Sequence, residues 1–192
     1  MSRSELKAYA KACLKGNIGN FFLCSLIVTL INIGCSFVPV IGTIASYIIT
    51  APFALGMILN CFNALKGEEV NLSTLFTGFN YLGTAVLMNF LIAVFTFLWS
   101  LLFLVPGIIK GLSYSMAMYV LAEHPEMKAT DAIKVSQQIM EGHKMEYFML
   151  LLSFFPWLLL TAVTFGIASI YVTPYLQLTV AQFYNNIKKN NF

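Results

Sequence analysis

The sequence predicts an all-α, polytopic membrane protein that forms a single integral membrane domain over residues 1–192. Three stretches without any charged residue carry this prediction, and they cover 16–65, 70–109 and 147–187. Hydrophobic residues make up 59% of the chain and charged residues 10%, with a mean hydropathy of +0.80, whereas roughly a quarter of the residues in a soluble domain are charged. Because a soluble domain needs polar cover, we expect lipid to be the solvent of these stretches.

Proline and glycine divide the three uncharged stretches into six expected transmembrane helices. A helix over the 50 residues of the first stretch would be about 75 Å long, more than twice the thickness of a bilayer core, so this stretch must fold back. Turn signals occur at 38–42 (VPVIG), at 105–107 (VPG) and, more weakly, at 164–166 (TFG). The resulting spans are about 18–37, 43–65, 80–104, 107–122, 146–163 and 167–187.

We expect these spans to form three parallel two-helix hairpin repeats, in units of about 3–66, 70–122 and 129–188. Each unit contains two spans, so every copy enters the membrane from the same side. The repeat is supported by aligning the second span with the sixth at one constant offset. The matched pairs are Pro52 and Pro174, Phe53 and Tyr175, Asn60 and Gln182, Phe62 and Tyr184, Asn63 and Asn185, Leu65 and Ile187, and Lys66 and Lys188.

A short amphipathic helix in the membrane interface is expected before each hairpin, ending at Gly16, Gly78 or Gly142. The alternative is an ordinary connector packed on the bundle. The glycines within 16–19 are expected to separate the first of these helices from the first span. The expected helix caps are Ser2 with Glu5, Asn71, and Thr130.

The orientation follows from the positions of lysine and arginine. Ten of the eleven lie in the N-terminal segment, in the loops around Lys66 and 128–144, or in the C-terminal tail. Six spans place all ten on one side, which should be the cytoplasm, together with both termini. Lys110 is the exception.

Several motifs resemble those of a known family. They are PGIIKGLSYSM at 106–116, DAIKVS at 131–136, MEGHK at 140–144 and TFG at 164–166, together with RSELK at 3–7, KGN at 15–17 and VTPY at 172–175. The chain resembles the bacterial membrane family catalogued as domain of unknown function 975, and more distantly the membrane portion of some glycerophosphodiester phosphodiesterases without their catalytic domain. The resemblance implies a six-helix protein of the bacterial cytoplasmic membrane, and the family brings no established activity with it.

Lys110 is the first candidate binding residue, because it lies about one turn inside the fourth expected span. A charge at the bilayer centre costs at least ~2.5 kcal/mol, so such residues are candidates for function. Lys110 could hold a lipid phosphate or an anionic solute, with Tyr114 one turn below it. The alternative is that its long stem lets the ammonium group reach the outer headgroups.

Three polar residues near the midplane are the other candidates. Asn89 lies in the third span, Gln177 in the sixth, and Ser153 at the repeat position that matches Asn89. They could line a polar pathway along the pseudo-threefold axis. The alternative is hydrogen bonding between helices, at about 0.6 to 2 kcal/mol each.

No catalytic, metal or cofactor motif stands out in the sequence. The nearest pairing for a metal, His143 with Glu146, has i, i+3 spacing instead of i, i+4, and the four cysteines have no C-x-x-C spacing. We therefore expect a non-enzymatic accessory protein of the membrane that interacts with lipids or with another membrane protein. The alternative is a small-solute transporter or channel along the pseudo-threefold axis. The net charge of +3 is too small to indicate a nucleic-acid partner.

Overall fold

The structure is a computed structural model that describes residues 3–37, 41–102, 104–164 and 168–191. The chain is 88% helical, and the described residues contain no strand, which confirms the predicted all-α class. The elements are α1 (Arg3–Ser36), α2 (Ile41–Lys66), α3 (Leu72–Thr77), the 3-10 helix η1 (Gly78–Tyr81), α4 (Leu82–Leu102), α5 (Leu104–Tyr114), α6 (Ala117–Glu123), α7 (Ala129–Ile139), α8 (Lys144–Leu152), α9 (Phe155–Val163) and α10 (Ser169–Asn191).

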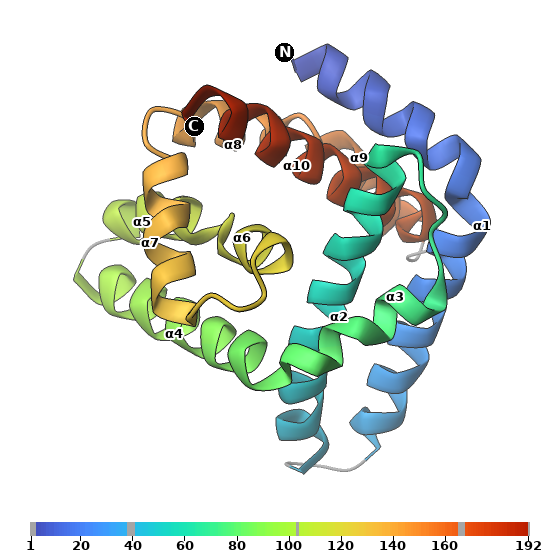
Figure 1. Cartoon of the computed structure of the whole chain (residues 1–192), viewed down its shortest axis with the longest axis horizontal. Helices are drawn as coiled ribbons and strands as arrows, with labels where there is room; N and C mark the ends of the chain where they lie inside the picture. Colours follow the sequence, from blue (N-terminus) through green and yellow to red (C-terminus); the bar gives the residue numbers. More distant parts are fainter. Residues whose placement is uncertain (1–2, 38–40, 103, 165–167, 192) are drawn as a thin grey trace.

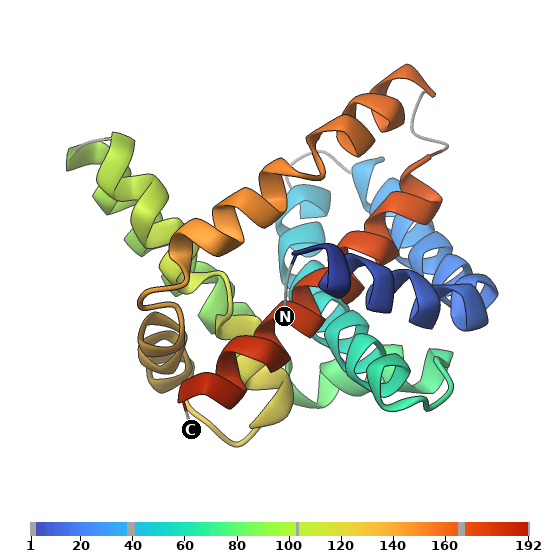
Figure 2. The ribbon, with the colours of Figure 1, turned by 90° about the horizontal axis from the view of Figure 1, so that it is seen from above.

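Helix α2 is the central element of the fold. It packs against α1, α3, α4, α6 and α10, and Figure 1 shows it between α1 on one side and α4 and α6 on the other. Figure 2 shows the last turns of α1, α4 and α9 toward its upper edge, while α3, α6 and α7 lie in its lower half. The last turns of α1, α4 and α9 therefore lie toward one end of the molecule, and the short helices α3, α6 and α7 toward the other.

Four helical segments are long and apolar enough to cross a membrane, judged by length and composition. The fourth and sixth expected spans are not among them. The fourth is divided between α5 and α6, and α10 carries three tyrosines, two glutamines and several asparagines that lower its hydropathy. The four segments are Arg3–Cys35, Ala45–Lys66, Leu72–Leu101 and Lys144–Val163.

The predicted helix break within 16–19 is wrong, because α1 runs without interruption from Arg3 to Ser36. Figures 1 and 2 both show α1 bending in its first half, so the N-terminal segment changes direction without leaving the helix. Glycine inside a helix costs only about 1 kcal/mol relative to alanine. Unbonded backbone groups in an apolar environment cost several kcal/mol each, which favours the continuous helix.

Two other expected spans are interrupted. The fifth divides between α8 and α9, where Pro156 lacks an N–H group and its ring crowds the carbonyl of Leu152. The backbone freed at this point is used, since Lys7 Nζ donates a hydrogen bond to the carbonyl oxygen of Ser153 at 3.0 Å. In the fourth expected span, the interruption lies between α5 and α6. There the hydroxyl of Ser115 donates a hydrogen bond to the carbonyl oxygen of Leu112 at 2.7 Å.

The three expected caps have different outcomes. Asn71 is confirmed as the N-cap of α3, where its side-chain oxygen accepts a hydrogen bond from the Thr74 N–H at 2.9 Å. The prediction of Thr130 as the N-cap of α7 is wrong, because α7 begins at Ala129. Its N-cap residue is Lys128, which forms no capping hydrogen bond with its side chain. Ser2 lies outside the described residues.

The glycines expected to end the lead-in segments lie in three different environments. Around Gly16 there is open space, Gly142 has a positive φ of 80°, and Gly78 lies against the backbone of α2. A Cβ atom at Gly78 would lie 2.0 Å from the carbonyl oxygen of Pro52, and one at Gly56 would lie 2.0 Å from the carbonyl oxygen of Leu75. Glycine at 56 and 78 therefore permits α2 to cross α3 and η1 in backbone contact.

Candidate functional site

Lys110 and Tyr114, the candidate pair on α5, each have an aromatic neighbour on α4. Lys110 is half-buried, and its Nζ lies 5.1 Å from the centre of the Trp99 ring. A cation–π contact of this kind contributes about 0.5–1 kcal/mol at an exposed site. Tyr114 is buried, with its ring centre 6.2 Å from that of Phe95. Both side chains thus have partners within the protein.

The other three candidates lie apart on α4, at the junction of α8 and α9, and on α10. Asn89, Ser153 and Gln177 are all half-buried, and the Oε1 atom of Gln177 is buried without a hydrogen-bond partner among the described residues. Within the described chain, no hydrogen bond, ion pair or ring contact joins any two of the five candidates. None of them lines either of the two cavities described below.

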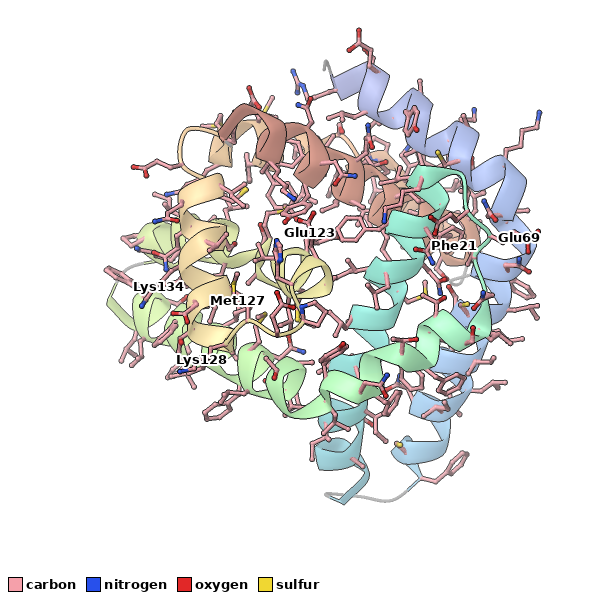
Figure 3. The ribbon with its side chains drawn as sticks, in the orientation of Figure 1. Phe21, Glu69, Glu123, Met127, Lys128 and Lys134 are labelled. Carbon is pink, nitrogen blue, oxygen red and sulfur yellow. The ribbon has the colours of Figure 1, made fainter. Side chains whose placement is uncertain are left out.

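A cavity of about 680 Å³ opens instead where the C-terminal turns of α2, α6 and α10 meet, beside the first turns of α1. We call it the three-helix cavity. Figure 3 places Glu123 on α6, in the space bordered by α2 and α10. The lining residues are Tyr9, Leu59, Phe62, Asn63, Leu65, Lys66, Ala122, Glu123, Gln182, Asn185, Asn186 and Lys188.

Three aromatic rings, one from each helix, pack together at this cavity. Phe62 and Tyr119 have ring centres 6.3 Å apart, Phe62 and Tyr184 are at 5.8 Å, and Tyr119 and Tyr184 are stacked at 5.8 Å. Such offset and tilted pairs contribute about 0.5–1.5 kcal/mol each beyond the area they bury. The aromatic cluster therefore holds the ends of α2, α6 and α10 together.

Each aromatic residue is followed four positions later by a charged residue, and residues four apart lie on the same face of a helix. The pairs are Phe62 with Lys66, Tyr119 with Glu123, and Tyr184 with Lys188. All three charged residues line the three-helix cavity. The same helix faces that pack the aromatic cluster therefore bring two lysines and one glutamate together.

The carboxylate of Glu123 is held from two sides. Lys188 Nζ donates a hydrogen bond to Oε1 and forms an ion pair with it, and the Tyr184 hydroxyl donates to Oε2 at 2.8 Å. Burial alone raises the pKa of the Glu123 carboxyl, but the hydrogen bonds from Lys188 and Tyr184 outweigh burial and hold that pKa below its ordinary value. Glu123 is therefore ionised at neutral pH.

Lys66 differs from Lys188. It is exposed at the rim, and among the described residues it takes part in no ion pair. Two lysines against one glutamate leave one uncompensated positive charge at the cavity. The amide side chains in the wall supply neutral hydrogen-bond donors next to that charge, and they belong to Asn63, Gln182, Asn185 and Asn186.

A second cavity of about 380 Å³ lies nearby, and Asn186 lines both. Its lining contains one basic residue, Arg3, and one acidic residue, Glu146, and most of its other side chains are apolar. Glu146 also lies 3.1 Å from His143, but no group of three or more His, Cys, Asp or Glu side chains in the described chain could hold a metal ion. The three-helix cavity is thus the site with an unbalanced charge.

The sequence analysis did not predict this cavity as a site, although it paired some of its residues as evidence for a repeat. The alignment of the second span with the sixth had already matched Phe62 with Tyr184 and Lys66 with Lys188. It missed the third helix, although a signal was present, because the spacing of an aromatic residue and a charge four positions later also occurs at 119–123.

Comparison with known proteins identifies the family. The family described as "Protein of unknown function (DUF975)" matches residues 1–110 and 104–191, which together span nearly the whole chain. No curated protein and no solved structure matches the chain. The similarity to glycerophosphodiester phosphodiesterases stays a prediction, whereas the family indicated by the sequence motifs is confirmed: the chain belongs to the DUF975 family.

Proposed function

We propose that this DUF975 protein is a multi-pass protein of the bacterial cytoplasmic membrane that acts by binding lipids or another membrane protein, without catalysis. The observation that carries the proposal is the large apolar surface that the helices leave exposed. In the first and in the third apolar segment, Arg3–Cys35 and Leu72–Leu101, only 11% of the most apolar stretch of 18 residues is buried inside the protein. Large exposed side chains occur near the ends of three helix pairs, for example Leu30, Ile33, Phe97, Leu101, Leu158 and Val163. A soluble monomer rarely exposes apolar patches of more than a few hundred Å².

The proposed topology has six crossings in three parallel hairpins, each with its amphipathic lead-in segment on the cytoplasmic side. The positions of the ends of α1, α4 and α9 in Figure 2 support it, and so does the sequence, in which ten of the eleven lysines and arginines lie before, between or after the three expected hairpins. The polar composition of α10 is compatible with a sixth span, because α10 packs against α1, α2 and α9 and buries residues such as Leu178 and Thr179. A span enclosed by other helices needs less apolar surface than one that faces lipid.

Cysteine labelling in intact cells tests this topology. In a background without the four native cysteines, we expect Phe37→Cys and Val163→Cys to react with an impermeant maleimide from outside, since these residues are 81% and 75% exposed. Lys128→Cys, at the opposite end, should react only after permeabilisation. Labelling of Phe37→Cys and Val163→Cys from opposite sides would contradict the parallel hairpins.

Native mass spectrometry after gentle extraction tests the binding role. We expect the protein to retain lipid or a membrane partner, because its exposed apolar side chains have no cover of their own. A bare monomer that stays folded without bound lipid or partner would count against the proposal.

A further inference from the structure

We propose that the three-helix cavity binds a phosphate group, with Lys66 as its principal cation. The cavity is lined by 12 residues, and its volume of about 680 Å³ lies within the range of small-molecule sites, roughly 300–1,000 Å³. The ligand class follows from the charge that the protein leaves unbalanced there.

The internal ion pairing explains why Lys66 is the available cation. The carboxylate of Glu123 already uses Oε1 for Lys188 and Oε2 for Tyr184. Three helices thus contribute a lysine, a glutamate and a lysine, and only two of these three charges pair with each other. Lys66 is left at the rim with its ammonium group available to an anion from outside the chain.

The last turn of α2 argues against a cation as the ligand. Helix C-termini attract cations through unpaired carbonyl groups, but these carbonyls already accept hydrogen bonds here. The Glu68 N–H donates to Asn63 at 2.9 Å, the Gly67 N–H to Ala64 at 3.1 Å, and the hydroxyl of Tyr9 to Leu65 at 3.1 Å. One of the two acceptor positions on each of these carbonyl oxygens is therefore occupied inside the protein, which makes them weaker ligands for a cation.

Among the described residues, neither Glu68 nor Glu69 of the nearby acidic loop forms an ion pair with Lys66. Figure 3 shows Glu69 beside α1, on the side of α2 away from Glu123. The wall offers amide groups from Asn63 and Asn185 as additional donors. Charge-assisted hydrogen bonds from an ammonium group, combined with neutral N–H donors, are a typical set for a phosphate oxygen.

Two sources could supply this phosphate, namely the headgroup of an anionic phospholipid and a soluble phosphate ester. The headgroup source rests on the proposed function, because it requires this end of the molecule to lie at the membrane surface. The soluble source does not. The probes are therefore glycerol 3-phosphate added to the detergent-purified protein, and nanodiscs of phosphatidylglycerol compared with phosphatidylcholine, whose phosphate is neutralised by its own choline.

The decisive variant is Lys66→Gln, with Lys128→Gln as its control. Lys128 is also exposed, but it does not line the cavity (Figure 3). We expect Lys66→Gln to weaken binding of the effective probe at least tenfold, which corresponds to about 1.4 kcal/mol, and Lys66→Arg to preserve it. Lys128→Gln should change binding less than twofold. Glu123→Gln should tighten binding, since it removes the negative charge at the cavity.

The outcomes separate the site from its source. Binding of either probe that depends on Lys66 supports the site, and the probe that binds identifies the source. Absence of binding to both probes, or equal losses in Lys66→Gln and Lys128→Gln, overturns the inference. If the labelling pattern of Phe37→Cys and Val163→Cys is as expected while binding is absent, the proposed topology stands and only this site is lost.

Discussion

The crossing of α2 with η1 gives the sharpest prediction about the fold. A Cβ atom at Gly78 would lie 2.0 Å from the carbonyl oxygen of Pro52 and 3.0 Å from the amide nitrogen of Gly56, and both of these are backbone atoms. An ordinary contact of a Cβ atom begins at 3.4 Å, so Gly78→Ala requires the two backbones to separate by more than 1 Å. No flexible side chain can move aside to absorb this change.

The separation would also loosen the aromatic contacts of this crossing, since the rings of Phe53 and Phe79 lie 4.9 Å apart. Overpacking usually costs about 1–3 kcal/mol, and a clash between backbones belongs at the upper end, near 3 kcal/mol. Gly19→Ala is the matched control, because nothing lies within 4 Å of its Cβ position inside α1. That control should gain about 0.5–1 kcal/mol.

Unfolding of the two variants in the same detergent, followed by circular dichroism, measures this difference. We expect a clear fall in the unfolding midpoint for Gly78→Ala and an equal or higher midpoint for Gly19→Ala. If Gly78→Ala unfolds with the midpoint of the unmodified protein, the close backbone crossing of α2 and η1 is refuted.

Three other predictions concern side chains that satisfy the backbone or each other. Asn60 is fully buried and forms two hydrogen bonds with the backbone of the exposed Asn71, at 3.2 and 3.3 Å, so Asn60→Leu should lower the unfolding free energy by about 1–3 kcal/mol through the loss of both hydrogen bonds. Because the pKa of the Glu123 carboxyl is lower in the folded protein than its ordinary value of 4.5, ionised Glu123 stabilises the folded state. This stabilisation is fully present above pH 4.5 and is lost as the pH falls through the pKa of the folded state. The midpoint difference between the protein and Glu123→Gln should therefore shrink below pH 4.5, and a constant difference would contradict this. Lys7→Met removes the donor to the Ser153 carbonyl and should lower the unfolding free energy, measured in the same detergent, by about 1.5–3 kcal/mol.

Features set by local chemistry could be predicted from the sequence. The Asn71 cap depends on a side chain three residues from its backbone partner, and the prolines at 52 and 174 lie inside α2 and α10 as the expected spans require. The all-α class follows from long apolar stretches that must satisfy their own backbone hydrogen bonds. Each of these features depends on neighbours in sequence.

Features set by packing could not be predicted in this way. The continuity of α1 through Gly16 and Gly19 depends on its environment and not on glycine propensity. The signal of Pro156 for the α8–α9 junction was present in the sequence, but the contact with Lys7 that completes this junction joins residues 146 positions apart. Among the candidate site residues, Lys110 contacts Trp99 on the adjacent helix. Sequence spacing cannot predict a contact between two helices of this kind.

The location of the three-helix cavity has a physical reason that also explains why Asn89, Ser153 and Gln177 do not assemble into a site. A polar group in an apolar helix is stabilised when it forms a hydrogen bond within the protein, as the hydroxyl of Ser153 does with the carbonyl of Leu150. One turn of helix rises about 5.4 Å, so a residue four positions beyond a buried ring can reach water. Lys66 can carry a full charge there without the cost of burial, while Phe62 fixes its helix against the other two. The end of α2 is thereby held in place, while the ammonium group of Lys66 stays exposed and open to a ligand.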